Sequence, residues 1–261
     1  MSRPIAKKQS GFTLVELVTV IVILGILAVG MSNFLQFGSR IFTETSARDQ
    51  LVSSARFAIE RLNREVRHAV PNSAKVDNAS GNCLSFFPTI ASTIYNDIPV
   101  SPEANSNTIT IIPFDDSDIA LANHVIVYPL MASDFTPSAN TKFHAFNLPI
   151  DKTLTPWELS FSSPVTFATD SPTQRIFFYG NEVSYCVVGT QLIRTSDGNS
   201  SLMADDILNY YNANNVAAFK LTEASQTRNA TIQIRLLFGV NGEESGEQVT
   251  FNNEIQVPNV P

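Results

Sequence analysis

Apolar residues dominate one long stretch near the start of the chain. No charged side chain occurs over residues 17–39, a run of 23 residues that is mostly Leu, Val and Ile. A helix of about 20 apolar residues is long enough to cross the hydrocarbon core of a bilayer. The run therefore predicts a membrane-spanning helix close to the N-terminus.

From residue 40 onward the pattern changes to that of a helix with one apolar face. The apolar positions recur at steps of three and four residues: Leu51, Ala55, Ala58, Ile59, Leu62, Val66 and Ala69. Charged residues fill the other positions, and Arg61 and Glu65 have the i,i+4 spacing of a helical ion pair. Because Pro71 cannot continue a helix, we predict one helix over residues 12–70 whose outer half packs on a globular domain.

Residues 71–261 predict a β-rich domain. Ten segments have the composition or the alternation typical of strands: residues 83–87, 108–112, 124–128, 158–162, 175–179, 182–188, 191–195, 216–222, 230–238 and 247–257. Gly189 and Thr190 form a short turn signal, so we expect a hairpin over residues 182–195. Polar stretches at residues 71–82, 96–107, 131–142 and 196–215 predict loops, and residues 201–211 have the composition for a short helix. The fold class is α+β.

Charge is distributed unevenly along the chain. Of the net charge of −7, the first eleven residues contribute +3, residues 12–70 contribute +1 and residues 71–261 contribute −11. A basic N-terminal tip stays in the cytoplasm by the positive-inside rule, so the acidic remainder is expected in the periplasm of a Gram-negative cell. The acidic balance also argues against a nucleic-acid partner, because such proteins neutralise phosphates with a basic surface.

The motifs of common enzyme and metal sites are missing from the sequence. Two cysteines and three histidines are too few for a zinc ribbon or a multi-cysteine cluster. There is no G-x-S-x-G elbow, P-loop or G-x-G-x-x-G. Asp197, Asn199 and Ser201 alternate like the start of a calcium loop, but the expected Gly and closing Glu do not follow, so a solvated loop is preferred. We therefore expect a protein that is not an enzyme and has no cofactor and no metal.

Glu16 lies at the edge of the apolar run. Its presence helps to choose among three interpretations of that run. A cleaved secretory signal has a shorter apolar stretch of about 7–15 residues, followed by a small-x-small site that this sequence does not have. A plain membrane anchor fits the length but not the carboxylate, which costs about 2.5–3.5 kcal/mol at mid-bilayer and less near the edge. The third interpretation uses the whole N-terminal segment.

Lys7, Lys8, Gly11, Phe12 and Glu16, together with the apolar run, make a pattern that resembles the N-terminus of type IV pilins and type II secretion pseudopilins. The resemblance implies that a prepilin peptidase cuts between Gly11 and Phe12 on the cytoplasmic face, and that the new amino group of Phe12 is then N-methylated. It also implies that Glu16 pairs with the Phe amine of a neighbouring subunit during assembly. Glu16 is then a registry device rather than a catalytic acid.

The same resemblance implies a pilin-like lollipop with four segments. They are a cytoplasmic leader peptide (residues 1–11), the transmembrane half of the helix (residues 12–39), its amphipathic half (residues 40–70) and a β-rich periplasmic head (residues 71–261). The implied partners are other major and minor pilins through the N-terminal helix, the prepilin peptidase and the inner-membrane assembly platform. We expect a single-pass inner-membrane protein that joins a cell-surface pilus when it is assembled.

Short stretches of the head narrow the resemblance. Residues 82–88, 183–195 and 252–261 are similar to the heads of minor pilins of MSHA-type pili, with minor pseudopilins of type II secretion as the next closest. The head is larger than that of a typical major pilin, which favours a minor subunit in a tip or initiation complex. Two rivals from other classes are a tip adhesin that binds through the loops at residues 96–107 and 131–142, and a membrane-anchored enzyme. The enzyme is disfavoured because no catalytic constellation is present.

Cys83 and Cys186 are the only two cysteines, and both lie in predicted strands of a domain expected to be exported. An oxidising periplasm permits a disulfide between them. The bond would close a loop of about 100 residues and add about 4–5 kcal/mol to stability if it acts by restricting the unfolded chain. Two buried free thiols are the alternative.

Overall fold

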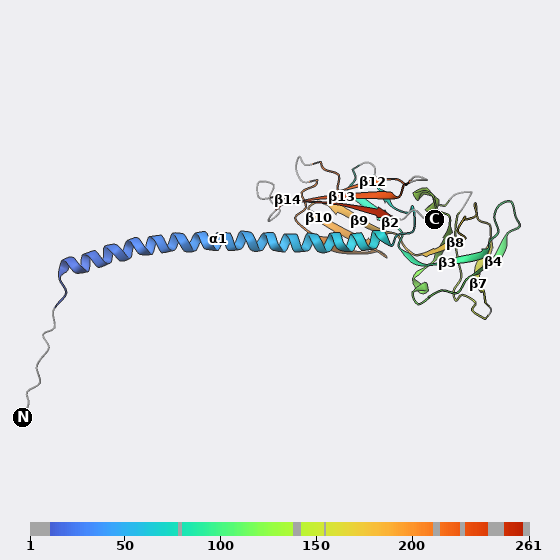
Figure 1. The fold of residues 1–261 in the computed structure, drawn as a ribbon, viewed down its shortest axis with the longest axis horizontal. Coiled ribbons are helices and arrows are strands. Elements are labelled where there is room, and N and C mark those ends of the chain that lie inside the picture. The colour runs from blue at the N-terminus through green and yellow to red at the C-terminus, as the bar shows by residue number, and fades with distance from the viewer. Residues whose placement is uncertain are drawn as a thin grey trace, which may run out of the picture. The chain divides into compact units, whose positions relative to one another are not determined.

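A long N-terminal helix is followed by a β-rich region (Figure 1). The computed structural model describes residues 11–77, 80–137, 142–153, 155–210, 215–224, 228–239 and 248–257. The chain divides into two compact units, residues 1–50 and residues 51–261, and we refer to the second as the head unit. Helix α1 (Leu14–Arg67) belongs to both units. The predicted α+β class, a long N-terminal apolar helix with a β-rich head, is confirmed.

The C-terminal end of α1 differs from the prediction. The helix ends at Arg67, four residues before Pro71, so the expectation that Pro71 ends a helix reaching residue 70 is wrong. The backbone after Arg67 pairs with a later segment, and the Val70 N–H donates to the Phe87 carbonyl at 2.8 Å. A long-range backbone hydrogen bond, rather than the missing N–H of proline, therefore competes with the last helical turn.

The amphipathic stripe of α1 is buried in the head unit, as the periodicity predicts. Its buried residues are Leu51, Ala55, Ala58, Leu62 and Val66, followed by Ala69 after the helix, while Ile59 is partly buried. These side chains share one hydrophobic core with residues of two sheets, including Leu84, Tyr185, Ile232 and Ile255. The helix is thus an integral part of the core.

Two antiparallel sheets enclose this core. The five-stranded sheet has the order β1 (Lys75–Val76), β2 (Cys83–Phe86), β9 (Val183–Val188), β10 (Gln191–Ser196) and β11 (Asn199–Ala204). The three-stranded sheet has the order β12 (Phe219–Thr222), β13 (Ala230–Gly239) and β14 (Gln248–Val257). Strand β13 alternates buried and exposed side chains along most of its length, which is the pattern that its sequence predicts.

A third sheet is inserted in the chain between the paired strands β2 and β9. Its order is β6 (Phe143–Ala145), β5 (His124–Val127), β8 (Arg175–Tyr179), β3 (Thr89–Asp97), β4 (Ser106–Ile111) and β7 (Trp157–Val165). Two short 3₁₀ helices, η1 (Ile119–Leu121) and η2 (Ala132–Phe135), lie in its connections. The sheet has its own core, and a smaller cluster around Val70, Phe87 and Tyr179 joins it to the end of the helix.

All ten predicted strands overlap strands of the structure, and the hairpin formed by β9 and β10 has the expected turn at Gly189, whose φ is +61°. The prediction for residues 196–215 is wrong over the part that forms β11. Asp197 and Gly198 both have positive φ, as in a type I′ turn, so β11 folds back on β10 as a second hairpin. Residues 201–204 are strand rather than helix, and residue 211 lies outside the described residues.

Other differences are local. Strand β3 and the short strands β1 and β6 have no counterpart among the predicted segments. The expected loop at residues 71–82 contains β1, and the one at residues 131–142 contains η2. The expected loop at residues 96–107 is shorter, because β3 continues to Asp97 and β4 begins at Ser106.

Cys83 and Cys186 are joined by a disulfide. They face each other directly across β2 and β9, with Cα atoms 4.1 Å apart. The neighbouring residues form a ladder hydrogen bond, in which the Val187 N–H donates to the Asn82 carbonyl. Cys83 and Cys186 are therefore a non-hydrogen-bonded pair, the type in which facing side chains come closest. The bond fixes the register of the two strands that flank the inserted sheet, 103 residues apart in sequence.

Replacing both cysteines by serine is expected to lower the free energy of unfolding by about 4–5 kcal/mol, because the loop that the bond closes is about 100 residues long. The measurement is urea unfolding of the full chain in detergent, compared with the oxidised wild type. Reduced and alkylated wild type serves as the control and should match the double variant. Equal unfolding midpoints for oxidised and reduced protein would contradict the expectation.

Candidate functional site

Gly11 and Phe12 precede the helix and are fully accessible. Both are outside regular structure, and 78% of the Phe12 surface is exposed. A Cβ added at Gly11 would meet no atom within 4 Å, and Gly11 has no left-handed backbone conformation. The fold of this chain therefore gives no reason for glycine at this position. The basic leader residues Lys7 and Lys8 lie outside the described residues.

The first turn of α1 is built by Thr13 and Glu16. The Thr13 hydroxyl accepts the Glu16 N–H at 3.3 Å, and the Thr13 carbonyl accepts the Leu17 N–H at 3.2 Å. Thr13 is thus the N-cap, and the T-x-x-E spacing is that of a capping box. We missed this cap in the sequence, although the spacing itself is the signal for it.

The Glu16 carboxylate is exposed in the first turn, where the positive end of the helix dipole favours a negative charge. No described side chain forms an ion pair with it. Phe12 lies four residues before Glu16, so both are at the same helix end. The arrangement leaves Glu16 open to a cation from outside this chain.

No described part of the chain covers the apolar part of α1. Among the described residues 11–50, every side chain except the half-buried Ala47 is exposed, and large apolar residues from Leu14 to Phe42 are 44–78% exposed. Helix α1 is long and apolar enough to cross a membrane. The core helix of a soluble protein has the same composition but is buried, whereas this one is not. The exposed apolar helix fits a membrane-anchored protein.

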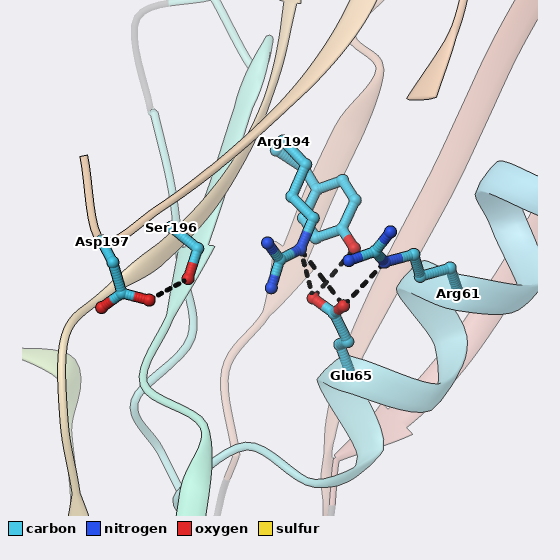
Figure 2. A network of polar contacts seen from close by, with 6 residues as sticks. Arg61, Glu65, Arg194, Ser196 and Asp197 are labelled. Carbon is cyan, nitrogen blue, oxygen red and sulfur yellow. Dashed lines mark hydrogen bonds and ion pairs between the residues drawn. The ribbon is translucent and has the colours of Figure 1, made fainter. Parts of the chain in front are cut away.

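A second polar cluster ties α1 to the head. The carboxylate of Glu65 accepts hydrogen bonds from Arg61 at 3.0 Å, from Arg194 at 2.9 and 3.1 Å, and from the Tyr185 hydroxyl at 2.9 Å. Figure 2 shows the two guanidinium groups on either side of the carboxylate. We refer to these four side chains as the Glu65 clasp. Glu65 and Arg194 are largely shielded, with 19% and 16% of their side chains exposed.

The environment of the clasp favours the ionised carboxylate. Burial by itself raises the pKa of Glu65, but the hydrogen bonds from Arg194, Arg61 and Tyr185 outweigh it and hold the pKa below the ordinary value. The pKa of Tyr185 is raised by burial and by the neighbouring Glu65. Burial lowers the pKa of Arg194, but Glu65 outweighs that effect and raises it. The clasp is therefore a charged, hydrogen-bonded unit at neutral pH.

The clasp and the disulfide act on the same strands. Tyr185 precedes Cys186 in β9, and Arg194 lies directly opposite Tyr185 in β10. The sequence predicts the pair of Arg61 and Glu65 but not the contribution of β9 and β10, which lie 120 and 129 residues away from Glu65. The covalent bond holds β9 to β2, while the clasp holds β9 and β10 to the helix.

The remaining candidate residues form no reactive cluster. Asp197 is at the tip of the hairpin formed by β10 and β11, where its carboxylate accepts hydrogen bonds from Asn181 at 2.8 Å and Ser196 at 2.9 Å. Over the described ranges of the chain, no group of three or more His, Cys, Asp or Glu side chains converges as metal ligands do.

Replacing Glu65 by glutamine is expected to lower the free energy of unfolding by about 2 kcal/mol at pH 7, because hydrogen bonds to charged groups contribute about 1.5–3 kcal/mol. The folded pKa lies below the ordinary value of 4.5. The stabilisation is therefore fully present above the unfolded pKa and is lost as pH falls through the folded pKa. Urea unfolding of the full chain in detergent, measured from pH 7 downward, checks this.

The matched control is Glu60→Gln, because Glu60 is an exposed carboxylate on the same helix. We expect its unfolding free energy to stay within about 0.5 kcal/mol of the wild type. A difference between wild type and Glu65→Gln that does not change with pH would show that the lost interaction is not the ionised carboxylate.

Comparison with known proteins identifies the N-terminal segment. The prokaryotic N-terminal methylation motif matches residues 6–32, which include Gly11, Phe12, Thr13 and Glu16 and the first turns of the apolar helix. No curated protein and no solved structure matches the chain. The motif covers the segment that is exposed and apolar in the structure. The chain thus carries the N-terminal methylation motif, which supports a protein of the type IV pilin or pseudopilin type that is processed by prepilin peptidase.

Proposed function

We propose that this chain is a minor pilin of a type IV pilus of the MSHA type, similar to MshO. The observation that carries the proposal is that the methylation motif at residues 6–32 coincides with an apolar helix that no part of the described chain covers. Such a helix needs either lipid or other apolar helices around it. A pilin-like subunit meets both, first in the inner membrane and then in the filament.

The processing site is the bond between Gly11 and Phe12. Nothing in the described part of the fold requires glycine at residue 11, so recognition by the peptidase is our explanation for the glycine at this position. Both residues lie before the first helical turn and are exposed, so an enzyme at the cytoplasmic face reaches the bond without unwinding α1. Cleavage leaves the amino group of Phe12 at the start of the helix, where it is then methylated.

Glu16 provides the registry between subunits. Its carboxylate has no partner among the described side chains, and an unpaired carboxylate is costly in an apolar environment. The cationic amine of a neighbouring subunit's Phe12 removes that cost. The pairing thus selects one axial position of the incoming helix. The partners are other major and minor pilins, together with the prepilin peptidase and the assembly platform of the inner membrane.

The segments then have distinct roles. We assign residues 1–11 to the cytoplasmic leader, residues 12–39 to the transmembrane half of the helix, the rest of α1 as far as Arg67 to its amphipathic half and residues 71–261 to the periplasmic head. A structural subunit of this kind is not an enzyme and takes part in filament assembly through its helix. The size of the head, with a separate inserted six-stranded sheet, favours a tip or initiation complex over a repeated position in the shaft.

A minor pseudopilin of a type II secretion system, similar to GspJ, is the second candidate. It is favoured by the same observation, because pilins and pseudopilins share the features of the N-terminal motif. The two candidates differ in which machine fails without the chain.

A strain that lacks this chain is expected to lose surface pili while exoprotein secretion stays intact. Electron microscopy counts the pili, and secreted enzyme activity is assayed in the same culture. The wild-type gene supplied in trans is the control and should restore the pili. Loss of secretion with normal pili would reject the pilus assignment in favour of the type II apparatus.

Glu16→Ala is expected to enter the membrane and to be cleaved normally, with Phe12 as its new N-terminus, but to enter filaments poorly. Removing one partner of a buried ion pair costs about 3–5 kcal/mol, so incorporation falls by more than about tenfold. Immunoblots of sheared filaments and N-terminal sequencing measure both steps. Glu44→Ala, an exposed carboxylate on the same helix, is the control, and normal incorporation of Glu16→Ala would contradict the registry role.

A further inference from the structure

Strand β14 is an open edge of the three-stranded sheet. It has ten residues and pairs with β13 along its whole length without a register shift. The Arg235 N–H of β13 donates to Ala218 on the β12 side, so the even-numbered residues of β13 bond to β14. Their partners are the odd-numbered residues of β14, which leaves the even-numbered ones directed outward.

Four residues of β14 therefore present unpaired backbone groups: Thr250, Asn252, Glu254 and Gln256. No hydrogen bond of the described chain uses their N–H or carbonyl groups. Their side chains are exposed, while those of Phe251 and Ile255 face the core. An edge with alternating free donors and acceptors is complementary to one structure only, another extended strand.

The other sheet edges of the described chain carry protection that β14 does not have. Strand β7 contains Pro164 and a register shift, and its outer side bonds to the segment at Asn147 and Asp151. Strand β11 has six residues and a shifted register, while β1, β6 and β12 have two to four residues. Edge strands are normally shortened, bulged or covered because they otherwise pair with another chain. The unprotected β14 is the exception.

A groove of about 360 Å³ runs between this edge and α1. Its helix side has Arg56, Ile59, Glu60 and Asn63, and its strand side has residues 251–253. The side chain of Asn253 donates to the Asn63 side chain at 2.6 Å, which fixes one end of the groove. A strand added to β14 thus places alternate side chains in the groove and the others in solvent.

The groove specifies the chemistry of that strand. Ile59 and Phe251 are partly buried apolar residues, so they fit apolar side chains. Arg56 is exposed, and Arg64 and Arg67 continue the outward face of the helix as exposed bases. Glu60, one helical turn after Arg56, is also exposed and lines the same groove. An incoming strand therefore needs an acidic side chain near Arg56, a basic side chain near Glu60 and apolar side chains beside them. Charge complementarity thus gives the strand one acidic and one basic side chain next to its apolar positions.

We propose that the open edge of β14 and the groove beside α1 bind an extended strand of a different pilin-like subunit, with apolar side chains beside one acidic and one basic residue. The partner rests on the proposed function, because it is another subunit of the same assembly. A second copy bound through its own β14 in a two-fold antiparallel pair is the main rival.

The test replaces Asn252 by proline in the full-length, affinity-tagged chain of the native strain. Proline removes the outward N–H of residue 252 but no hydrogen bond to β13, so the sheet is kept. We expect co-purification of other proteins with the methylation motif from detergent extracts to fall by about tenfold. The matched variant Asn252→Thr keeps the N–H and is expected to retain them. Disulfide formation and the thermal midpoint report whether the proline variant is folded.

Hydrogen exchange gives a readout that does not depend on a substitution. The amides of Thr250, Asn252, Glu254 and Gln256 are expected to exchange at least about tenfold more slowly in the purified assembly than in the chain alone. The amides of the odd-numbered residues are expected to be protected in both. Retention of the partner by a folded Asn252→Pro, or equal exchange of the four edge amides in both samples, would overturn the inference.

Different outcomes of these measurements would overturn the proposed function and the role of β14. If the wild type co-purifies no protein with the methylation motif, the proposed function fails. If wild type co-purifies such proteins and its edge amides stay unprotected, the proposed function stands and the role of β14 fails. Protection of the edge by a second copy, seen as a cross-linked homodimer, would overturn the identity of the partner.

Discussion

The burial of one helical stripe by two sheets is the contact on which the head unit depends. Leu51, Leu62 and Val66 supply apolar area, while Ala55 and Ala58 let the strands approach the helix closely. Because the core contains residues of α1, the five-stranded sheet and the three-stranded sheet, none of the three has a complete core without the others. Nearer the N-terminus, the apolar side chains of the same helix are exposed rather than buried. One helix therefore has a part that packs in a protein core and a part whose apolar surface is left open.

Apolar burial alone does not set how the helix sits along its own axis, because the hydrophobic effect has no direction. The Glu65 clasp fixes the position of the helix along its axis, because its hydrogen bonds form in one position only. Arg194 reaches both oxygens of the Glu65 carboxylate, and Tyr185 reaches one of them. A rotated or shifted helix would separate Glu65 from its partners and leave a shielded charge unpaired. The free-energy cost of that separation is larger than the net stability that the intact clasp adds. The disulfide next to it fixes the strands from which Tyr185 and Arg194 project.

The sequence predicts local features of this protein well, since local periodicity is a strong signal. The apolar run, the buried stripe of α1 and all ten proposed strands follow from spacing alone. The end of α1 does not, because the Val70 N–H bonds to a segment that is distant in sequence. The polar composition of residues 196–215 predicts a loop, but the Asp-Gly pair at residues 197–198 is itself a strong hairpin signal, and the strand β11 that follows it agrees with that signal.

For the candidate site, the residue types were visible in sequence but their surroundings were not. The spacing of Gly11, Phe12 and Glu16 indicates the processing motif, and comparison with known motifs supports it. The Thr13 cap was also readable, from its spacing to Glu16. The partners of Glu65 and the open side of β14 were not readable, because both depend on which strands become neighbours. Strand order is a property of the whole chain rather than of any short segment.

The two flanks of α1 in the head differ in a way that explains where a further chain can add. On the side of β10, the helix is held by the charged clasp, and the disulfide holds the adjoining strand β9. On the side of β14, a hydrogen bond between the neutral side chains of Asn63 and Asn253 links the helix to the strand, with a groove beside it. Opening the first flank separates buried charges, whereas adding to the second only exchanges water for backbone partners. The rigid flank keeps the helix in place, so that the open edge presents a constant surface.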